Sequence, residues 1–206
     1  MTVKAVIFDV GNVLLEWKPE AFFSGKYGVA RAKAFFAKTE IEAVNYRIDL
    51  GAPFKDSLYD YAEKAPEFAA EIRDWHDSWL QMASPDIPHS VRLLRALRSK
   101  GVPVFALTNF GIETWEIARG VFPFLDEFDR LYHSSRMKTA KPSPRIYEMV
   151  EEDCGHSGDE LIFTDDKEEN LAAAGVYGWK THLFTDPAGW AARLVVEGML
   201  TEEEAV

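Results

Sequence analysis

Residues 3–12 read VKAVIFDVGN and describe a buried strand that ends in an acidic residue. The run Val3–Phe8 is almost wholly apolar and rich in β-branched side chains, which is typical of strands buried on both faces of a parallel sheet. Asp9 follows directly, and Gly11 permits a tight turn in which backbone groups approach a ligand closely. The stretch therefore predicts a strand whose carboxyl end carries a functional carboxylate.

The rest of the chain repeats this strand pattern with helical segments in between. Further short apolar runs, rich in β-branched or aromatic residues, predict strands at residues 102–107, 130–133, 161–164 and 180–184. Apolar residues at helical spacing predict helices at residues 90–99, 144–152 and 167–174. Strands that alternate with helices in this way predict an α/β fold with a doubly wound, Rossmann-like parallel sheet.

One long segment, residues 17–85, has no convincing strand pattern. It contains helical stretches rich in Ala, Phe, Glu and Lys, which predict roughly four helices with breaks near residues 25–28, 51–53 and 66. A proline-rich segment, residues 84–88, then returns the chain to the alternating pattern. We therefore expect two domains, an α/β core of residues 1–16 and 86–206 and an inserted all-helical cap of residues 17–85.

Charge and cysteine content argue against some classes of protein. The chain of 206 residues carries a formal net charge of −11, which disfavours a nucleic-acid partner because phosphates are bound by basic surfaces. Its single cysteine, Cys154, permits no intramolecular disulfide and fits a reducing compartment. The sequence shows no signal-peptide pattern and no long apolar stretch, so we expect a cytoplasmic protein without a membrane partner.

Polar residues gather where the predicted strands end. In open α/β sheets, ligands bind beyond the carboxyl ends of the strands. The residues at these ends, and in one loop before a helix, are Asp9, Thr108, Asn109, Lys141, Asp165 and Asp166. Carboxylates from two strands make an oxygen site suited to Mg²⁺, and a hydroxyl and an ammonium suit the remaining oxygens of a phosphate. Singly, Asp166 also reads as an N-cap and Lys141 as a solvated lysine; together they favour an anion site with a local cation.

Four segments carry a resemblance to a known family. They are IFDVGNVL (residues 7–14), ALTN (106–109), KPSPRIYE (141–148) and FTDDKEENLAAA (163–174). Together and in this order they resemble the four motifs of the haloacid dehalogenase-like (HAD) hydrolase superfamily. The resemblance covers essentially the whole chain, because the helical segment matches the cap domain that subfamily IA carries between its first and second motifs. The Asp-x-Gly-Asn start resembles bacterial members described as glucose-1-phosphate or sugar-phosphate phosphatases.

The resemblance implies a phosphatase that requires Mg²⁺. Asp9 is then the nucleophile, which attacks phosphorus and forms an aspartyl-phosphate that water hydrolyses. The implied metal ligands are Asp9, Asp166, the backbone carbonyl of Gly11 and, as a second ligand or in support of the first, Asp165. The implied catalytic residues that stabilise the transferred group are Thr108 and Lys141.

The implied substrate is a small phosphorylated metabolite such as a sugar phosphate, because a small cap closes over compact substrates. The expected contacts in the core are Gly11, Asn12 and Asn109. In the cap, Asn45, Arg47 and Asp49 hold positions that often face the pocket in caps of this type. Arg47 is an attractive anion contact, with a solvated arginine as the alternative. The oligomeric state is left open between a monomer and a homodimer.

One position departs from the family pattern. Most phosphatases of the superfamily have an aspartate where this chain has Gly11. That aspartate protonates the leaving group and then activates water, and such acid–base catalysis typically raises the rate by about 10²–10⁴-fold. The glycine is compatible with a slow enzyme, a substrate with a good leaving group, a substitute acid from the cap, or no turnover. His76 is one candidate for a substitute acid, with a packed histidine as the alternative. The competing functions are a metal-independent 2-haloacid dehalogenase and a weakly active or non-catalytic binding protein of this fold.

Overall fold

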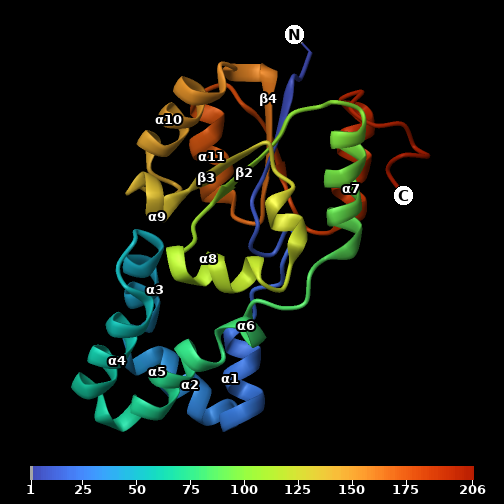
Figure 1. Cartoon of the computed structure of the whole chain (residues 1–206). Coiled ribbons are helices and arrows are strands. Elements are labelled where there is room, and N and C mark those ends of the chain that lie inside the picture. Colours follow the sequence, from blue (N-terminus) through green and yellow to red (C-terminus); the bar gives the residue numbers. More distant parts are fainter. Residues whose placement is uncertain (1) are drawn as a thin grey trace.

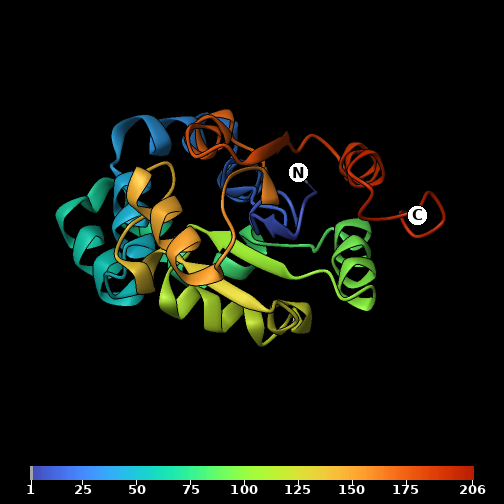
Figure 2. The same ribbon diagram turned by 90° about the horizontal axis from the view of Figure 1, so that it is seen from above.

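The computed structural model describes residues 2–206 and contains one sheet of five strands (Figure 1). The strands lie in the order β3-β2-β1-β4-β5, and every neighbouring pair is parallel. Their bounds are β1 Ala5–Phe8, β2 Val104–Thr108, β3 Arg130–His133, β4 Leu161–Asp165 and β5 Lys180–Leu183. Helices cover both faces of this sheet (Figure 2), so the predicted doubly wound α/β fold is confirmed.

The sequence patterns located the strands to within two residues at each end. The range 130–133 is unchanged, whereas β1 and β2 begin two residues later than predicted. The predicted start, Val3, is only 4% exposed although it precedes the strand. The buried stretch is therefore longer than the part of β1 that pairs with neighbouring strands. An apolar run in the sequence indicates which residues are buried, and not where the hydrogen-bonded strand begins.

The central strand shows how the two faces of the sheet are filled. Side chains alternate along β1, so that Val6 and Phe8 belong to one apolar cluster and Ala5 and Ile7 to the other. The first cluster includes residues of α7 (Pro88–Ser99) and α12 (Pro187–Val196), and the second includes residues of α10 (Pro144–Cys154) and α11 (Glu168–Val176). Figure 2 shows these two pairs of helices on opposite sides of the strands. The remaining elements of this part are α8 Ile112–Arg119, α9 Ser134–Met137 and the 3₁₀ turns Pro123–Asp126 and Gly158–Glu160.

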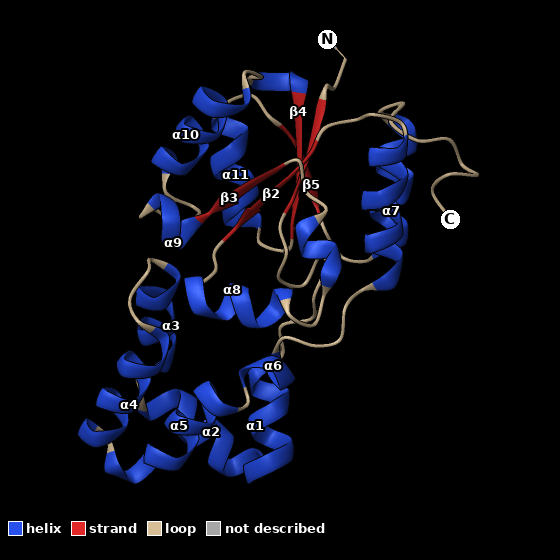
Figure 3. Cartoon of the chain, viewed as in Figure 1, coloured by secondary structure: helices blue, strands red, loops and turns tan. Residues whose placement is uncertain are grey.

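The segment from α1 to α6, between β1 and α7, contains helices and no strand (Figure 3). Its helices are α1 Pro19–Tyr27, α2 Val29–Lys38, α3 Ile41–Asp49, α4 Phe54–Lys64, α5 Ala69–Asp77 and α6 Trp79–Met82, with a 3₁₀ turn at Pro66–Phe68. Six helices form instead of the predicted four. The predicted breaks were placed at glycine and proline residues, whereas α2 and α5 end without either. The Thr39 hydroxyl donates to the Phe35 carbonyl at 2.7 Å, and the Ser78 hydroxyl donates to the Asp74 carboxylate at 2.7 Å.

The helices α1–α6 lie beyond the carboxyl ends of the strands (Figure 1). An aromatic cluster fills their centre, where the Phe23 ring lies 4.8 Å from that of Phe35 and 5.8 Å from that of Trp75. We call this segment the cap, and its exact limits at residues 17 and 85 stay a prediction. Among residues 2–206, no helix has both the length and the apolar character needed to span a bilayer.

Candidate active site

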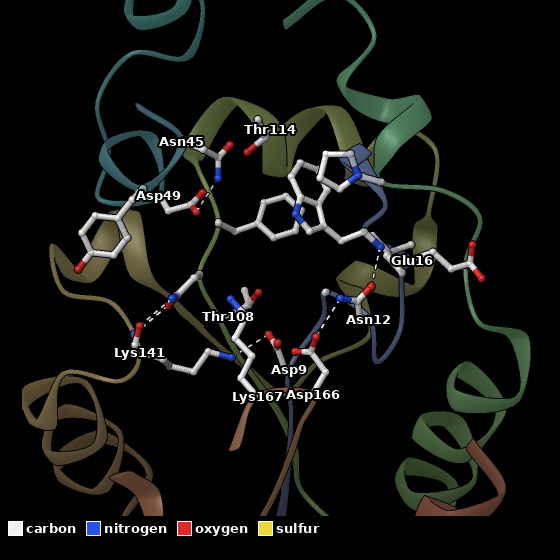
Figure 4. A pocket seen from close by; sticks show the side chains of 18 of the residues that line it. Asp9, Asn12, Glu16, Asn45, Asp49, Thr108, Thr114, Lys141, Asp166 and Lys167 are labelled. Atoms are coloured by element: carbon white, nitrogen blue, oxygen red, sulfur yellow. Dashed lines mark hydrogen bonds and ion pairs between the residues drawn. The ribbon is translucent and has the colours of Figure 1, made fainter. Parts of the chain in front are cut away.

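A cavity of about 390 Å³ separates the strand ends from the cap (Figure 4). Core residues, among them Asp9, Thr108 and Asp166, form its floor, and the cap residues Asn45 and Asp49 lie on the opposite wall. The acidic side chains that line it are Asp9, Glu16, Glu42, Asp49 and Asp166, against the two lysines Lys141 and Lys167. An anion would be repelled by this excess of negative charge unless a further cation were present.

The position of Asp9 follows from the pairing of β1 with β4. Phe8 lies opposite Thr164, and the Asp9 amide donates to the Thr164 carbonyl at 2.9 Å. Oδ1 of Asp9 accepts from the Val10 amide at 2.7 Å and lies 2.8 Å from Nζ of Lys141. Within residues 2–206, no hydrogen bond reaches Oδ2. One oxygen is thus held in place while the other is available at the cavity floor.

Lys141 is held from both ends of its side chain. Its Nζ lies 2.8 Å from Oδ1 of Asp9 and 2.6 Å from Oδ2 of Asp165, with 1% of the side chain exposed. Its backbone amide donates to Oδ1 of Asn109 at 2.8 Å, and Nδ2 of Asn109 donates to its carbonyl at 2.9 Å. The expected substrate contact, Asn109, therefore lines the cavity but uses its amide group to position Lys141.

The Asp165 carboxylate is surrounded by hydrogen-bond donors of the protein. The carboxylate is fully buried and accepts from Nζ of Lys141 at 2.6 Å and from the Lys167 amide at 2.8 Å. Nδ2 of Asn170 adds contacts of 2.9 and 3.0 Å to the two oxygens. Because protein donors satisfy both oxygens, Asp165 is better suited to orient the site than to bind a metal directly.

Asp166 has an oxygen pattern that suits a metal ligand. Its Oδ2 accepts from Nδ2 of Asn12 at 2.8 Å, and Oδ1 of Asn12 accepts from the Trp17 amide at 2.8 Å. Asn12 was expected to contact substrate, but both ends of its side-chain amide are used to hold Asp166 and the turn after β1. Carboxylate oxygens of Asp9, Asp165 and Asp166 lie within 4.8 Å of one another. This spacing and an all-oxygen donor set fit a hard cation such as Mg²⁺.

Burial sets the protonation of the two central groups. Burial is the largest effect on Asp9 and raises its pKa to about 7. The Lys141 ammonium lowers this pKa, and the carboxylates of Asp165 and Asp166 raise it. For Lys141, burial lowers the pKa, but Asp165 and Asp9 outweigh it, so the pKa is raised and the ammonium is retained. The cluster carries one ammonium for several carboxylates, and a bound cation would favour the ionised form of Asp9.

The turn after β1 differs from its expected geometry. The left-handed backbone conformation falls on Asn12, with φ of 54°, and not on Gly11. A Cβ atom at Gly11 would meet no other atom within 4 Å, so the glycine is not required by steric crowding. Thr108, which is 1% exposed, has a hydroxyl without a partner among the described residues. It lines the cavity floor and leaves a donor available for an anion.

One face of α3 forms part of the cap wall. The residues of α3 that line the cavity are Glu42, Asn45, Tyr46 and Asp49, and the residues buried in the cap are Ile41, Val44 and Ile48. Arg47 is exposed and is not among the lining residues, so the structure does not bring it together with the strand-end residues. Two residues along a helix are roughly 200° apart, so Arg47 points nearly opposite to Asp49.

His76 also lies outside the cavity. Its ring packs 4.7 Å from that of Phe54, and its Nδ1 lies 2.7 Å from the Asp77 carboxylate. The alternative of a packed histidine therefore describes it, and it does not reach the strand ends.

Lys167 is a charged residue of the cavity that the sequence did not predict there. Its amide donates to Asp165 and its side chain lines the cavity beside Asp166 (Figure 4). The available signal was its place directly after the two aspartates at the end of β4, where the carboxyl edge of the sheet lies. It supplies the second positive charge of the cavity.

Comparison with known proteins adds the following similarities. The family model described as haloacid dehalogenase-like hydrolase matches residues 3–178. The chain is 29% identical over 183 residues to sesquiterpene phosphatase astK of Aspergillus oryzae, covering 86% of this chain and 87% of that protein. It is 22% identical over 201 residues to D-ribitol-5-phosphate phosphatase of Bacteroides thetaiotaomicron, covering 94% and 98%. A solved HAD family enzyme of Bacteroides thetaiotaomicron, in complex with magnesium and inorganic phosphate, is similar with a TM-score of 0.69 and 25% identity, covering 87% of this chain and 93% of that one.

Proposed function

The chain belongs to the haloacid dehalogenase-like hydrolase family, and from this premise we propose that it is a Mg²⁺-dependent phosphatase of small phosphorylated metabolites that uses Asp9 as nucleophile. One observation carries the proposal. Oδ1 of Asp9 is held by the Val10 amide and by Lys141, while Oδ2 is without a hydrogen bond within residues 2–206 and lies at the floor of the cavity. A fixed carboxylate with one unengaged oxygen is suited to in-line attack on phosphorus.

We propose that Asp9, Asp166 and the backbone carbonyl of Gly11 bind the metal ion, with Asp165 in support. The spacing of the carboxylate oxygens and the absence of nitrogen or sulfur ligands among them support Mg²⁺. When bound, the ion supplies positive charge that lets a phosphate approach several carboxylates. The similar enzyme of Bacteroides thetaiotaomicron in complex with magnesium and inorganic phosphate supports the same assignment.

The chain's own residues then have separate tasks. Oδ2 of Asp9 bonds to phosphorus as the leaving oxygen departs, and water later releases phosphate from the aspartyl-phosphate. The Lys141 ammonium and the Thr108 hydroxyl hold phosphoryl oxygens during both steps. Asp165, Asn109 and the other supporting groups keep Lys141 in position.

The cavity supports a compact organic phosphate as substrate. Its volume of about 390 Å³ suits a small molecule, and Trp17, Trp79 and Phe110 are among the residues that line it. The two phosphatases similar to this chain are named for a sesquiterpene and for D-ribitol 5-phosphate, which supports a phosphate monoester of a small alcohol. The cap inserted between β1 and β2 and the Asp-x-Gly-Asn start support subfamily IA and its sugar-phosphate phosphatases.

The test is a screen of phosphorylated metabolites with Mg²⁺ and with EDTA. We expect phosphate release that requires Mg²⁺ and that is lost in Asp9→Asn, while the exposed cap variant Asp60→Asn keeps it. Chloride release from 2-chloropropionate in EDTA would instead identify a dehalogenase. Wild-type activity in Asp9→Asn would show that Asp9 is not the nucleophile.

A further inference from the structure

Gly11 stands where most phosphatases of the family carry the carboxylic acid that protonates the leaving oxygen, so this chain has no such acid at that position. Gly11 has no side chain, and the open space around it leaves the position unfilled. Lys141 is engaged with Asp9 and Asp165, and Asp165 is saturated with donors. A carboxylic acid that protonates the leaving group would therefore come from another part of the cavity wall.

We propose that Asp49, the last residue of α3, is the general acid and base of the reaction; this inference rests on the proposed phosphatase function. Asp49 lines the same cavity as Asp9 and lies on its opposite wall (Figure 4). A substrate whose phosphate rests on the floor extends its leaving group toward this wall. The group that Gly11 lacks is thus replaced by a residue of the cap.

The Asp49 side chain is oriented by a short chain of hydrogen bonds. Nδ2 of Asn45 donates to Oδ2 of Asp49 at 3.0 Å, and Oδ1 of Asn45 accepts from Nε1 of Trp75 at 3.2 Å. The indole thereby fixes which end of the amide faces Asp49. Within residues 2–206 no other hydrogen bond reaches the carboxylate, so its Oδ1 is available to carry a proton toward the substrate.

The backbone of Asp49 is tied to the core of the protein. Its carbonyl accepts from the Ser134 hydroxyl at 2.6 Å, and the same hydroxyl oxygen accepts from the Phe110 amide at 2.9 Å. Phe110 follows directly on Thr108 and Asn109 at the end of β2. Asp49 therefore stands at a set position relative to the strand ends, as proton transfer requires.

The protonation of Asp49 suits the task. Burial raises its pKa to about 7, the Lys167 ammonium lowers it and the Asp9 carboxylate raises it. The charged groups around it are Asp9 and Lys167 of the floor, Glu42 of its own helix, and Lys138, which donates to the Leu50 carbonyl at 3.5 Å. A general acid works best with a pKa near the working pH, and a neutral carboxyl also avoids repelling a phosphate.

Other acids near the cavity fit the role less well. Glu16 is paired with Lys18, whose Nζ lies 2.6 Å from its carboxylate. Glu42 is exposed, and His76 does not line the cavity. Asp49 alone among these is both oriented by a buried partner and close enough to Asp9 for their charges to interact.

Protons and bonds balance in both steps. First, Oδ2 of Asp9 bonds to phosphorus, the bond from phosphorus to the leaving oxygen breaks, and the Asp49 proton moves to that oxygen to give the alcohol. The Asp49 carboxylate then takes a proton from water while the water oxygen bonds to phosphorus and the bond to Asp9 breaks. Inorganic phosphate leaves, and both aspartates return to their starting states.

The experiment compares Asp49→Asn with the wild type on two substrates. Turnover of butyl phosphate, which has a poor leaving group, should fall by about 10²–10⁴-fold. With 4-nitrophenyl phosphate, whose leaving group needs no proton, the variant should release one equivalent of nitrophenolate in a burst and then turn over slowly, because the aspartyl-phosphate accumulates. The matched variant Asp60→Asn should behave as wild type, because Asp60 is exposed on α4.

Two further measurements keep the proposal testable. Gly11→Asp in the Asp49→Asn background should restore part of the butyl phosphate activity, since the space at Gly11 is open. In the wild type, phosphorylation by butyl phosphate should decline as pH rises through about 7, and this decline should be absent in Asp49→Asn. If Asp49→Asn does not fold, Asp49→Ser takes its place in the comparison of butyl phosphate with 4-nitrophenyl phosphate.

The failures of the two proposals are distinct. Wild-type protein without Mg²⁺-dependent hydrolysis of any phosphate ester overturns the proposed function. Wild-type hydrolysis that is lost in Asp9→Asn but unchanged in Asp49→Asn, with no burst, overturns the role of Asp49 and leaves the phosphatase intact.

Discussion

Replacing Lys141 by methionine tests whether one buried ammonium holds the site together. Nζ lies 2.8 Å from Asp9 and 2.6 Å from Asp165, and these two side chains are 11% and 0% exposed. Methionine fills similar space but leaves two buried carboxylates without their cation. Removing one partner of a buried ion pair costs about 3–5 kcal/mol, so we expect the free energy of unfolding of Lys141→Met to fall by about that amount at pH 8.

The loss should depend on pH with a defined sign. Lys141 lowers the pKa of Asp9, so its removal raises the folded-state pKa further above the unfolded value of about 3.9. A raised carboxyl pKa means that the folded state binds more protons, and stability is lost as pH rises through that pKa. The difference between variant and wild type should therefore be smaller at pH 5 than at pH 8.

Urea unfolding in EDTA at both pH values measures this difference. Lys4→Met is the control, because the ion pair of Lys4 with Glu160 lies at the surface, with 57% and 23% of the side chains exposed, and its loss should change stability little. A Lys141→Met variant less than about 1 kcal/mol below wild type at pH 8, or equally destabilised at both pH values, would refute the buried ion-pair account.

Two further predictions concern the cap turn and the metal. Gly51→Ala should destabilise the protein by more than the about 1–2 kcal/mol that a left-handed backbone alone costs, because φ is 95° and the new Cβ would lie 2.9 Å from the Ser135 carbonyl oxygen. Gly155→Ala, with φ of 73°, ψ of 14° and open space around the new Cβ, isolates the backbone cost in the same urea assay. Mg²⁺ at 100 times its Kd should stabilise the wild type by about 2.7 kcal/mol, and Asp166→Asn should lose most of this gain in a thermal shift measurement.

The strand ends were predictable because the fold itself brings them together. Once the alternating pattern predicted a parallel sheet, Asp9, Thr108 and Asp166 had to share one edge, and the structure places them on one cavity floor. Lys141 joined them through its place before a helix, and it proves to be almost fully buried between two carboxylates. Sequence order thus predicted which residues meet in the core.

The partners of individual side chains were not predictable in the same way. Asn12 donates to Asp166 across 154 residues, and Asn109 bonds the backbone of Lys141. Both are predicted from the sequence to contact substrate, and no pattern in the sequence shows that other protein groups already use their side-chain amides. The outward position of Arg47 did have a signal in the sequence, because the apolar positions of α3 fix which face of the helix is turned inward.

The absence of an acid at Gly11 has to be considered together with the cap side of the cavity. The floor holds Asp9, Lys141 and Asp166 beside the strand ends, whereas α3 forms part of the opposite wall. If the acid stands on α3, the site is complete only while the Ser134 hydroxyl links the end of α3 to the end of β2. Proton transfer then depends on how well the cap is seated, whereas attack by Asp9 does not. The loss of one side chain in the core thus makes a full catalytic cycle depend on the cap, and the burst expected of Asp49→Asn separates these two halves.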